Sequence, residues 1–397
     1  MAVLKSLSIL NDLPDNSRYA KGSYPLSKVV TDVTKEILSA SPELVVNAYY
    51  DNRQRSFLEN RILNILDRQQ YFAIGSKRKM IKSIFDFMFG YGQLQEYIED
   101  DEISDIDGVR YNCFSVTKNG VRMPADIDFC TEADFFVYCK LIALRNGGIL
   151  NENDSHCRVA DIRNKLRINI SIHPRNISGP ALSIRKHRRN AYTLEDLNEI
   201  GMLDSTCTDI LMETLLSDKT IILCGKGGSG KTTLLRALIN VLPEMERVLI
   251  VESDAEIYPD KLYCIEQRVK RDNEGGNPIT LDMLIKDGLT MSLDTYCIGE
   301  IVGSEAMAFL NACCSGHRFL TTMHADKPKD CAKRLVALAK GAKGISDEKM
   351  LLSLFGEGVD CIVFMQDFAV TEIMNVKGID TALNSVFYEN VYNRRRE

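Results

Sequence analysis

The chain has 397 residues, of which 26% are charged, and its formal net charge is −6. This length allows two or three domains, each with a hydrophobic core of its own. The mild acidic balance, broken only by the short run Arg394-Arg395-Arg396, argues against a dedicated nucleic-acid binder.

The first residues show no sustained apolar core of the kind found in signal peptides, and no later stretch reaches the eighteen or so uncharged residues of a membrane span. We therefore expect a cytoplasmic protein that does not insert into a membrane. Its twelve cysteines include no Cys-x-x-Cys pair, which predicts reduced, buried thiols and no metal module or disulfide framework.

The hydrophobic pattern predicts four regions in chain order. Helical spacing over residues 1–85, as in Leu26, Val29, Val30, Val33 and Ile37, predicts a helical extension. Short alternating runs with one helix predict a mixed α/β domain with a twisted antiparallel sheet over 86–190. Residues 191–204 are expected to form a linker with room for a short helix. Apolar runs separated by helical segments then predict a RecA-like P-loop domain, a doubly wound α/β core, over 205–397.

Residues 225–232 read Gly-Lys-Gly-Gly-Ser-Gly-Lys-Thr, between the apolar run 220–224 and a helix-forming segment. Glycines let the backbone N–H groups wrap around phosphates, and the following helix presents its positive end to the anion. Lys231 is expected to reach the β and γ phosphates and Thr232 the magnesium ion. The predicted binding residues are Gly225, Gly227, Gly228, Ser229, Gly230, Lys231, Thr232 and Thr233, which indicates a nucleoside triphosphate site.

One acidic cluster, a single glutamate and a histidine follow later strands of the same predicted sheet. Residues 252–256 read Glu-Ser-Asp-Ala-Glu after the run 248–251, Glu300 follows 295–298, and His324 follows 319–323. Because ligands of parallel α/β sheets bind at the carboxyl ends of the strands, we expect these groups to face the phosphates. A carboxylate there can activate water and another can hold magnesium. A histidine taken alone is more often structural.

These motifs, in this order, resemble those of the secretion and pilus traffic ATPase superfamily of type II and type IV secretion systems. The resemblance covers the phosphate loop, the aspartate box 251–256, the atypical Walker B segment 298–306, and the histidine box with Ser315-Gly316-His317 and residues 321–325. Upstream, residues 89–95, 102–106, 167–169 and 179–186 resemble that family's N-terminal domain. The match covers roughly residues 85–390.

The resemblance implies catalytic roles for Glu256, Glu300, His324 and Lys231. Glu256 would activate water, Glu300 would be the Walker B acid that holds Mg²⁺ with Thr232, and His324 would couple the γ-phosphate to movement. Arg167 and Arg185 would reach a nucleotide at a subunit boundary, although a solvated charged edge is the other interpretation of this basic stretch.

The resemblance also implies ATP and Mg²⁺ as ligands, a homo-hexameric ring, and an inner-membrane platform protein as partner at the cytoplasmic face of the membrane. No nucleic-acid partner is expected. ATP is favoured since the sequence contains no Asn-Lys-x-Asp guanine-reading motif. The missing four-cysteine module and the helical extension favour the branch of tight-adherence (Flp) pili and type IV secretion.

The sequence departs from the family pattern near the Walker B acid. Val302 stands where a basic residue is usual, Thr290 and Leu293 stand in the approach to that strand where Arg and Pro are usual, and Ser253 displaces the usual Asp to Asp254. Two alternatives therefore stay open beside a working motor: a nucleotide-binding scaffold of the same apparatus with little hydrolysis, and a RecA-like nucleic-acid motor. The absence of tryptophan and the acidic balance weigh against the second alternative.

Overall fold

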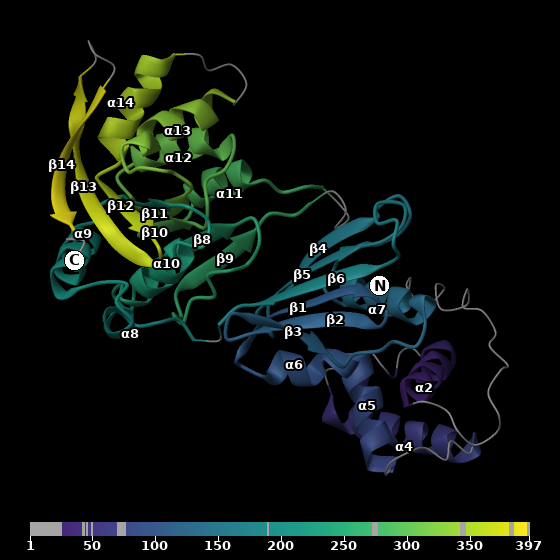
Figure 1. Cartoon of the computed structure of the whole chain (residues 1–397). Helices are drawn as coiled ribbons and strands as arrows, with labels where there is room; N and C mark the ends of the chain where they lie inside the picture. Colours follow the sequence, from purple (N-terminus) through teal and green to yellow (C-terminus); the bar gives the residue numbers. More distant parts are fainter. Residues whose placement is uncertain are drawn as a thin grey trace. The chain divides into compact units, whose positions relative to one another are not determined.

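The computed structural model describes residues 26–41, 44, 47–48, 51–69, 77–188, 190–271, 277–341, 347–380 and 385–394. The first 25 residues of the expected helical extension therefore lie outside the described part. The chain divides into two compact units, one formed mainly by residues 1–187 and the other mainly by 188–397. Each unit has its own hydrophobic cores. Figure 1 shows the helices and strands that form the two units.

Among the described residues, the first unit begins with the helices α2 (Leu26–Ala40), α4 (Asn52–Arg68) and α5 (Lys77–Phe89). Their apolar faces pack together in one cluster that includes Val29, Ile62 and Ile84, all fully buried. The apolar faces predicted from the sequence are thus buried within the chain's own helices. Phe57 on α4 is 64% exposed, whereas its neighbour Leu58 is fully buried in this core.

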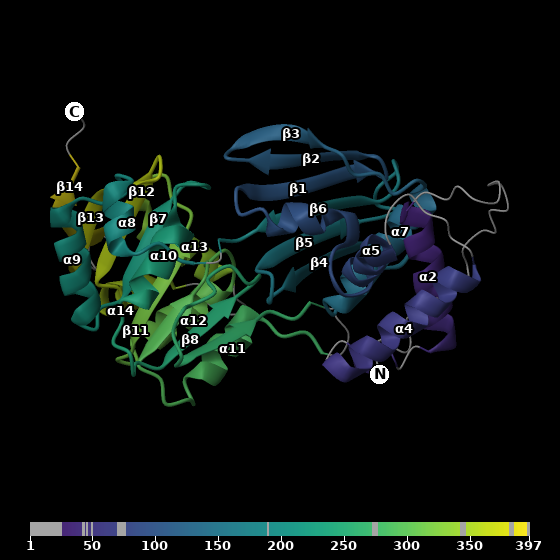
Figure 2. The same cartoon turned by 90° about the horizontal axis from the view of Figure 1, so that it is seen from below.

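An antiparallel six-stranded sheet forms the rest of the first unit, in the order β3-β2-β1-β6-β5-β4 (Figure 2). Helix α7 (Glu132–Arg145) contributes Phe135, Tyr138 and Ile142 to the core under this sheet. The alternating burial of Leu166–Ser171 shows the period of two expected for a half-buried strand. The other elements are η2 (Gly92–Leu94), α6 (Gln95–Glu99), β1 (Ile103–Arg110), β2 (Cys113–Lys118), β3 (Val121–Ala125), β4 (His156–Asp161), β5 (Leu166–Ser171) and β6 (Ala181–Lys186).

The second unit is built on an eight-stranded sheet in the order β14-β13-β12-β7-β11-β10-β8-β9. The six strands from β12 to β9 are parallel, and β13 and β14 extend the sheet as an antiparallel hairpin. The expected doubly wound core is confirmed. The strands are β7 (Ile221–Gly225), β8 (Val248–Glu252), β9 (Cys264–Arg268), β10 (Thr295–Ile298), β11 (Arg318–Met323), β12 (Cys361–Gln366), β13 (Ala369–Asp380) and β14 (Ser385–Asn393).

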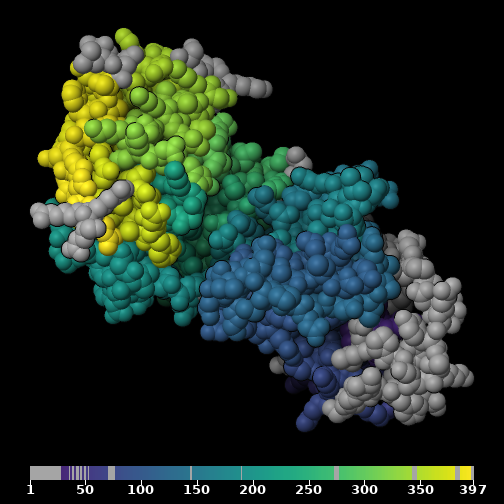
Figure 3. Space-filling view, viewed as in Figure 1, coloured from purple at the N-terminus to yellow at the C-terminus, as the bar shows by residue number. Residues whose placement is uncertain are grey.

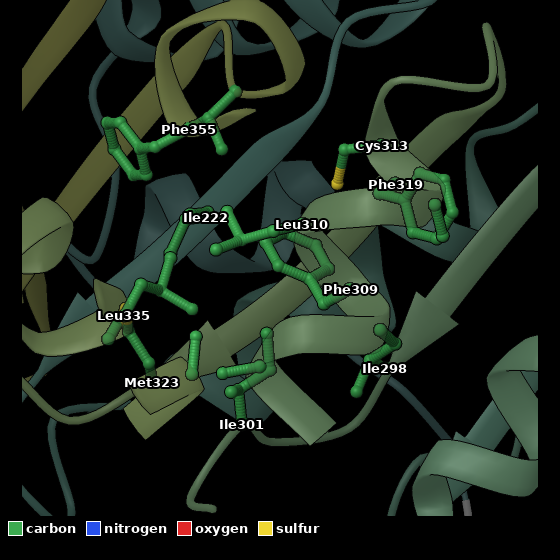
Figure 4. Close-up of a cluster of buried hydrophobic side chains, with 14 of the residues drawn as sticks. Ile222, Ile298, Ile301, Phe309, Leu310, Cys313, Phe319, Met323, Leu335 and Phe355 are labelled. Carbon is green, nitrogen blue, oxygen red and sulfur yellow. The ribbon is translucent and has the colours of Figure 1, made fainter. Parts of the chain in front are cut away.

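Helices cover both faces of this sheet, because successive strand residues point to opposite sides. Ile222 belongs to the cluster under one group of helices, whereas Ile221 and Leu223 belong to the cluster under the other. Figure 4 shows the first cluster, where Phe309 and Phe319 pack edge to face. The first group is α11 (Leu281–Gly288), α12 (Glu305–Cys313), α13 (Asp330–Lys340) and α14 (Glu348–Gly358), and the second is α8 (Leu194–Glu199), α9 (Ser205–Leu216) and α10 (Lys231–Asn240).

The segment 191–204, expected to be a linker with room for a short helix, contains helix α8 and contributes to the core of the second unit. A capping box between Thr193 and Asp196 begins helix α8. Leu197 and Met202 are then completely buried beside α9 and α10. The segment is only fourteen residues long, so its apolar residues gave too short a pattern to predict this packing.

In the space-filling view the C-terminal strands β13 and β14, coloured yellow, cover one flank of the second unit (Figure 3). None of the helices in the described ranges combines the length and the apolar character needed to cross a bilayer.

Candidate active site

The phosphate loop connects strand β7 to helix α10 and depends on two close backbone approaches. A Cβ at Gly225 would lie 2.2 Å from the carbonyl oxygen of Met365 on the neighbouring strand β12. Gly230 has φ 92° and caps the helix, and a Cβ there would lie 2.6 Å from the Met202 methyl carbon. Only glycine fits these positions, because a side chain would meet both left-handed strain and occupied space.

Lys231 and Ser229 bring buried polar groups to the inside of this loop. The Lys231 Nζ donates hydrogen bonds to the carbonyl oxygens of Gly225 at 3.1 Å and Lys226 at 2.9 Å, and burial lowers the pKa of this ammonium. Ser229 is 4% exposed, and its hydroxyl has no hydrogen-bond partner among the described residues. A bound phosphate would accept from both groups, which meets the requirement that buried polar groups be paired. Thr232 and Thr233 follow in the first, half-buried turn of α10.

Glu300 and His324 lie in contact at the carboxyl ends of two neighbouring strands, β10 and β11. The His324 Nε2 lies 2.9 Å from a carboxylate oxygen of Glu300, and its Nδ1 lies 3.3 Å from the carbonyl oxygen of Gly225. Both ring nitrogens thus face oxygen atoms, one of the Glu300 carboxylate and one of the phosphate-loop backbone. A Cβ at Gly227 would lie 3.7 Å from the histidine ring. The structure therefore places Glu300, His324 and the phosphate loop together.

The acidic residues at the end of strand β8 and in the segment that follows have two different environments. Glu252 is 5% exposed, and its Oε1 accepts hydrogen bonds from the backbone N–H groups of Glu256 and Ile257, both at 3.1 Å. Burial, with a smaller contribution from the Glu256 charge, raises the pKa of Glu252 to about 8. Glu256 itself is half-buried. Glu252 thus fixes the backbone that carries Glu256, a role that its position after a strand did not indicate.

Glu305 holds the backbone that follows Glu300. One of its carboxylate oxygens accepts from the N–H groups of Val302 and Gly303, both at 2.7 Å, while the carboxylate stands in the first turn of α12. The sequence signal that could have indicated this role was an acidic residue in the first turn of a helix. The Val302 side chain is 53% exposed, so the residue that departs from the family pattern faces solvent.

The two arginines predicted to approach a nucleotide lie in the other unit. Arg167 on β5 and Arg185 on β6 are direct cross-strand partners on the exposed face of the six-stranded sheet, and Asp105 on β1 pairs with Arg185. The structure thus brings these two arginines together. It assigns them to a unit different from that of the phosphate loop, Glu256, Glu300 and His324.

Comparisons with known proteins match a stretch of the chain that includes the phosphate loop, Glu300 and His324. The family profile described as "Type II/IV secretion system protein" matches residues 153–354. The chain is 30% identical over 200 residues to a Mycobacterium tuberculosis (strain H37Rv) protein named as a putative conjugal transfer protein, covering 50% of this chain and 56% of that protein. It is 33% identical over 147 residues to VirB11 of Agrobacterium fabrum, covering 36% of this chain and 43% of VirB11. The matched stretch spans about half the length of these curated relatives.

Two solved structures share the fold. The pilus retraction motor PilT with bound ADP superposes with a TM-score of 0.51 at 15% identity, covering 76% of this chain and 83% of PilT. The ATPase DotB of Legionella pneumophila superposes with a TM-score of 0.50 at 17% identity, covering 75% of this chain and 78% of DotB. At these identities the likeness supports the two-part α/β fold and nothing finer.

Proposed function

Because this chain belongs to the type II/IV secretion system protein family, we propose that it is an ATP hydrolase that powers secretion or pilus assembly. One observation carries the proposal: the buried Lys231 Nζ and the His324 Nδ1 both contact the carbonyl oxygen of Gly225 at one phosphate loop, and the His324 Nε2 contacts Glu300. This arrangement puts a fixed positive charge, an acid and a proton donor beside the position of a γ-phosphate. Phosphoryl transfer needs little more from a protein than such positioning and charge stabilisation.

In the proposed reaction, each group acts on one part of the triphosphate or the attacking water. Lys231 neutralises the β and γ phosphates, while Glu256 orients and deprotonates the water. The backbone of Glu256 is already fixed by Glu252. His324 leaves the carbonyl oxygen of Gly225 to follow the γ-phosphate, which couples the loss of that phosphate to movement of strand β11.

The residues present fit a magnesium ion. Thr232 supplies a hydroxyl and Glu300 a carboxylate, the oxygen donors that Mg²⁺ prefers. Glu300 is close enough to Lys231 for its charge to oppose the effect of burial on the lysine pKa. The ion would neutralise charge on the phosphates of the bound nucleotide.

We further propose that the protein works as a homo-hexamer at the cytoplasmic face of the inner membrane, where a platform protein grips the ring. Arg167 and Arg185 would then reach a nucleotide across a subunit boundary. The helices α2, α4 and α5 ahead of the sheet, together with a VirB11 and a conjugal transfer protein among the relatives, support the tight-adherence pilus and type IV secretion branch.

A second candidate is a nucleotide-gated scaffold of the same apparatus. Its support is Val302, which leaves an exposed apolar side chain where the family usually has a basic one. A missing charge stabiliser at such a site costs roughly 100-fold to 1000-fold in turnover.

Phosphate release from the purified chain with Mg²⁺ and ATP distinguishes the two functions. If the protein is a motor, the hydrolysis rate per subunit should rise with protein concentration. This hydrolysis should be lost in Lys231→Ala and in Glu256→Gln. Lys286→Ala, which removes an exposed lysine paired with Asp282 on α11, serves as the matched control. A native chain that binds ATP without turnover, with the binding lost in Lys231→Ala and kept in Glu256→Gln, would identify the scaffold. A native chain that does not bind ATP would refute both functions.

A further inference from the structure

A bulky aromatic residue occupies a strained turn at the end of strand β12. Gln366 and Ala369 are the last paired residues of the β12–β13 hairpin, so Asp367 and Phe368 alone form its turn. Both have positive φ, 50° and 61°. Such two-residue turns favour Asn-Gly or Gly-Gly, since a residue with a large side chain is strained there. Strain of this kind persists where function or the surroundings require it.

This turn lies beside the phosphate loop. Strand β12 pairs with β7 up to Met365 and Gly225, so the two strands end together. A Cβ at Gly230 would lie 3.0 and 3.1 Å from two ring carbons of Phe368, and 2.6 Å from the methyl carbon of Met202. Phe368 and Met202 therefore border the residue that directly precedes Lys231.

Phe368 is held in place and yet open to solvent. Its ring contacts the Gly230 region, but 40% of the residue remains exposed. Met202 is completely buried, and its carbonyl oxygen accepts hydrogen bonds from the N–H of Val370 at 3.0 Å and from Arg394 at 3.4 Å. The hairpin and the loop around Met202 are thus tied together, which leaves an ordered aromatic surface at the rim of the phosphate loop.

We propose that Phe368 is the platform on which the base of the bound nucleotide stacks, with Met202 supporting the ring. This inference rests on the proposed nucleotide-binding function and names the part of the nucleotide that the phosphate loop does not hold. Stacking on an aromatic ring tolerates different bases, because every base has a π face. A purine covers more of the ring than a pyrimidine, so the platform selects purine nucleotides by stacking area.

The test separates base binding from phosphate binding in Phe368→Gly. Glycine adopts the positive φ without strain, so this variant should melt at the same or a higher temperature than the native chain. Loss of base stacking should weaken ADP binding by about 5-fold to 150-fold. Binding of inorganic tripolyphosphate, which has no base, should change less than about twofold. Phe368→Tyr keeps the ring and should retain ADP affinity. Phe387→Ala on β14 removes another exposed phenylalanine, 55% exposed, and is the control.

Three results would overturn the proposal: unchanged ADP affinity in Phe368→Gly, equal weakening of ADP and tripolyphosphate, or a lower melting temperature with tripolyphosphate binding also lost. The first two leave the proposed function standing if the native chain binds both ligands. A native chain that binds neither ADP nor tripolyphosphate overturns the proposed function as well, so the two failures are distinguishable.

Discussion

Replacing Glu252 by glutamine should stabilise the second unit, and the gain should grow with pH. The Glu252 carboxyl is buried at the end of β8, where one oxygen accepts from the N–H groups of Glu256 and Ile257. A glutamine side chain has the same shape, keeps that acceptor oxygen and carries no charge at any pH.

The magnitude follows from the pKa of Glu252, which the fold raises from its ordinary value of 4.5 to about 8. Between these values the folded state keeps its proton while the unfolded state has lost it, so ionisation favours unfolding. The stability present below pH 4.5 is therefore lost as pH rises through this window. At about 1.4 kcal/mol per pKa unit, the loss is about 2 kcal/mol at pH 6 and about 4 kcal/mol at pH 8. Glutamine at position 252 avoids this loss.

Urea unfolding of the native chain and of Glu252→Gln at several pH values between 5 and 8.5, followed by circular dichroism, measures the effect. The difference in unfolding free energy between the two proteins should increase by about 2 kcal/mol from pH 6 to pH 8. Glu213→Gln changes an exposed carboxyl on α9 and should show no such slope. A difference that stays constant with pH, or that shrinks toward pH 8, would refute the reasoning.

Two further predictions concern carboxylates that hold backbone or buried charge. Glu305→Ala leaves the N–H groups of Val302 and Gly303 without their acceptor. It should therefore cost about 2 kcal/mol of stability in urea unfolding and lower turnover in the phosphate-release assay. Glu305→Gln keeps an acceptor oxygen and should retain most of the stability and most of the turnover in the same assays. Arg318→Ala should cost about 3–5 kcal/mol in urea unfolding, because the guanidinium donates at 2.6 Å to Glu246, a carboxylate only 8% exposed. Replacing this pair together, as Arg318→Met with Glu246→Leu, should restore most of the loss, and a double variant as unstable as the single one would contradict this account.

The sequence by itself determined the phosphate loop and the edge of the sheet at which its partners lie. The spacing of glycines, Lys231 and Thr232 has few structural uses other than binding phosphate. Glu300 and His324 follow short apolar runs, and parallel strands of one sheet end at the same edge, so their proximity to the loop followed from topology alone.

Only the tertiary structure decided which carboxylates are available and what borders the loop. Glu252 and Glu256 are four residues apart, yet packing buries the first against backbone N–H groups and leaves the second half exposed. Met202, in a segment expected to be a linker, and Phe368, in a turn 138 positions after Gly230, meet at that glycine. Local patterns report the neighbours of a residue along a helix or strand, whereas contacts between distant segments and the burial of a charge depend on how the layers pack.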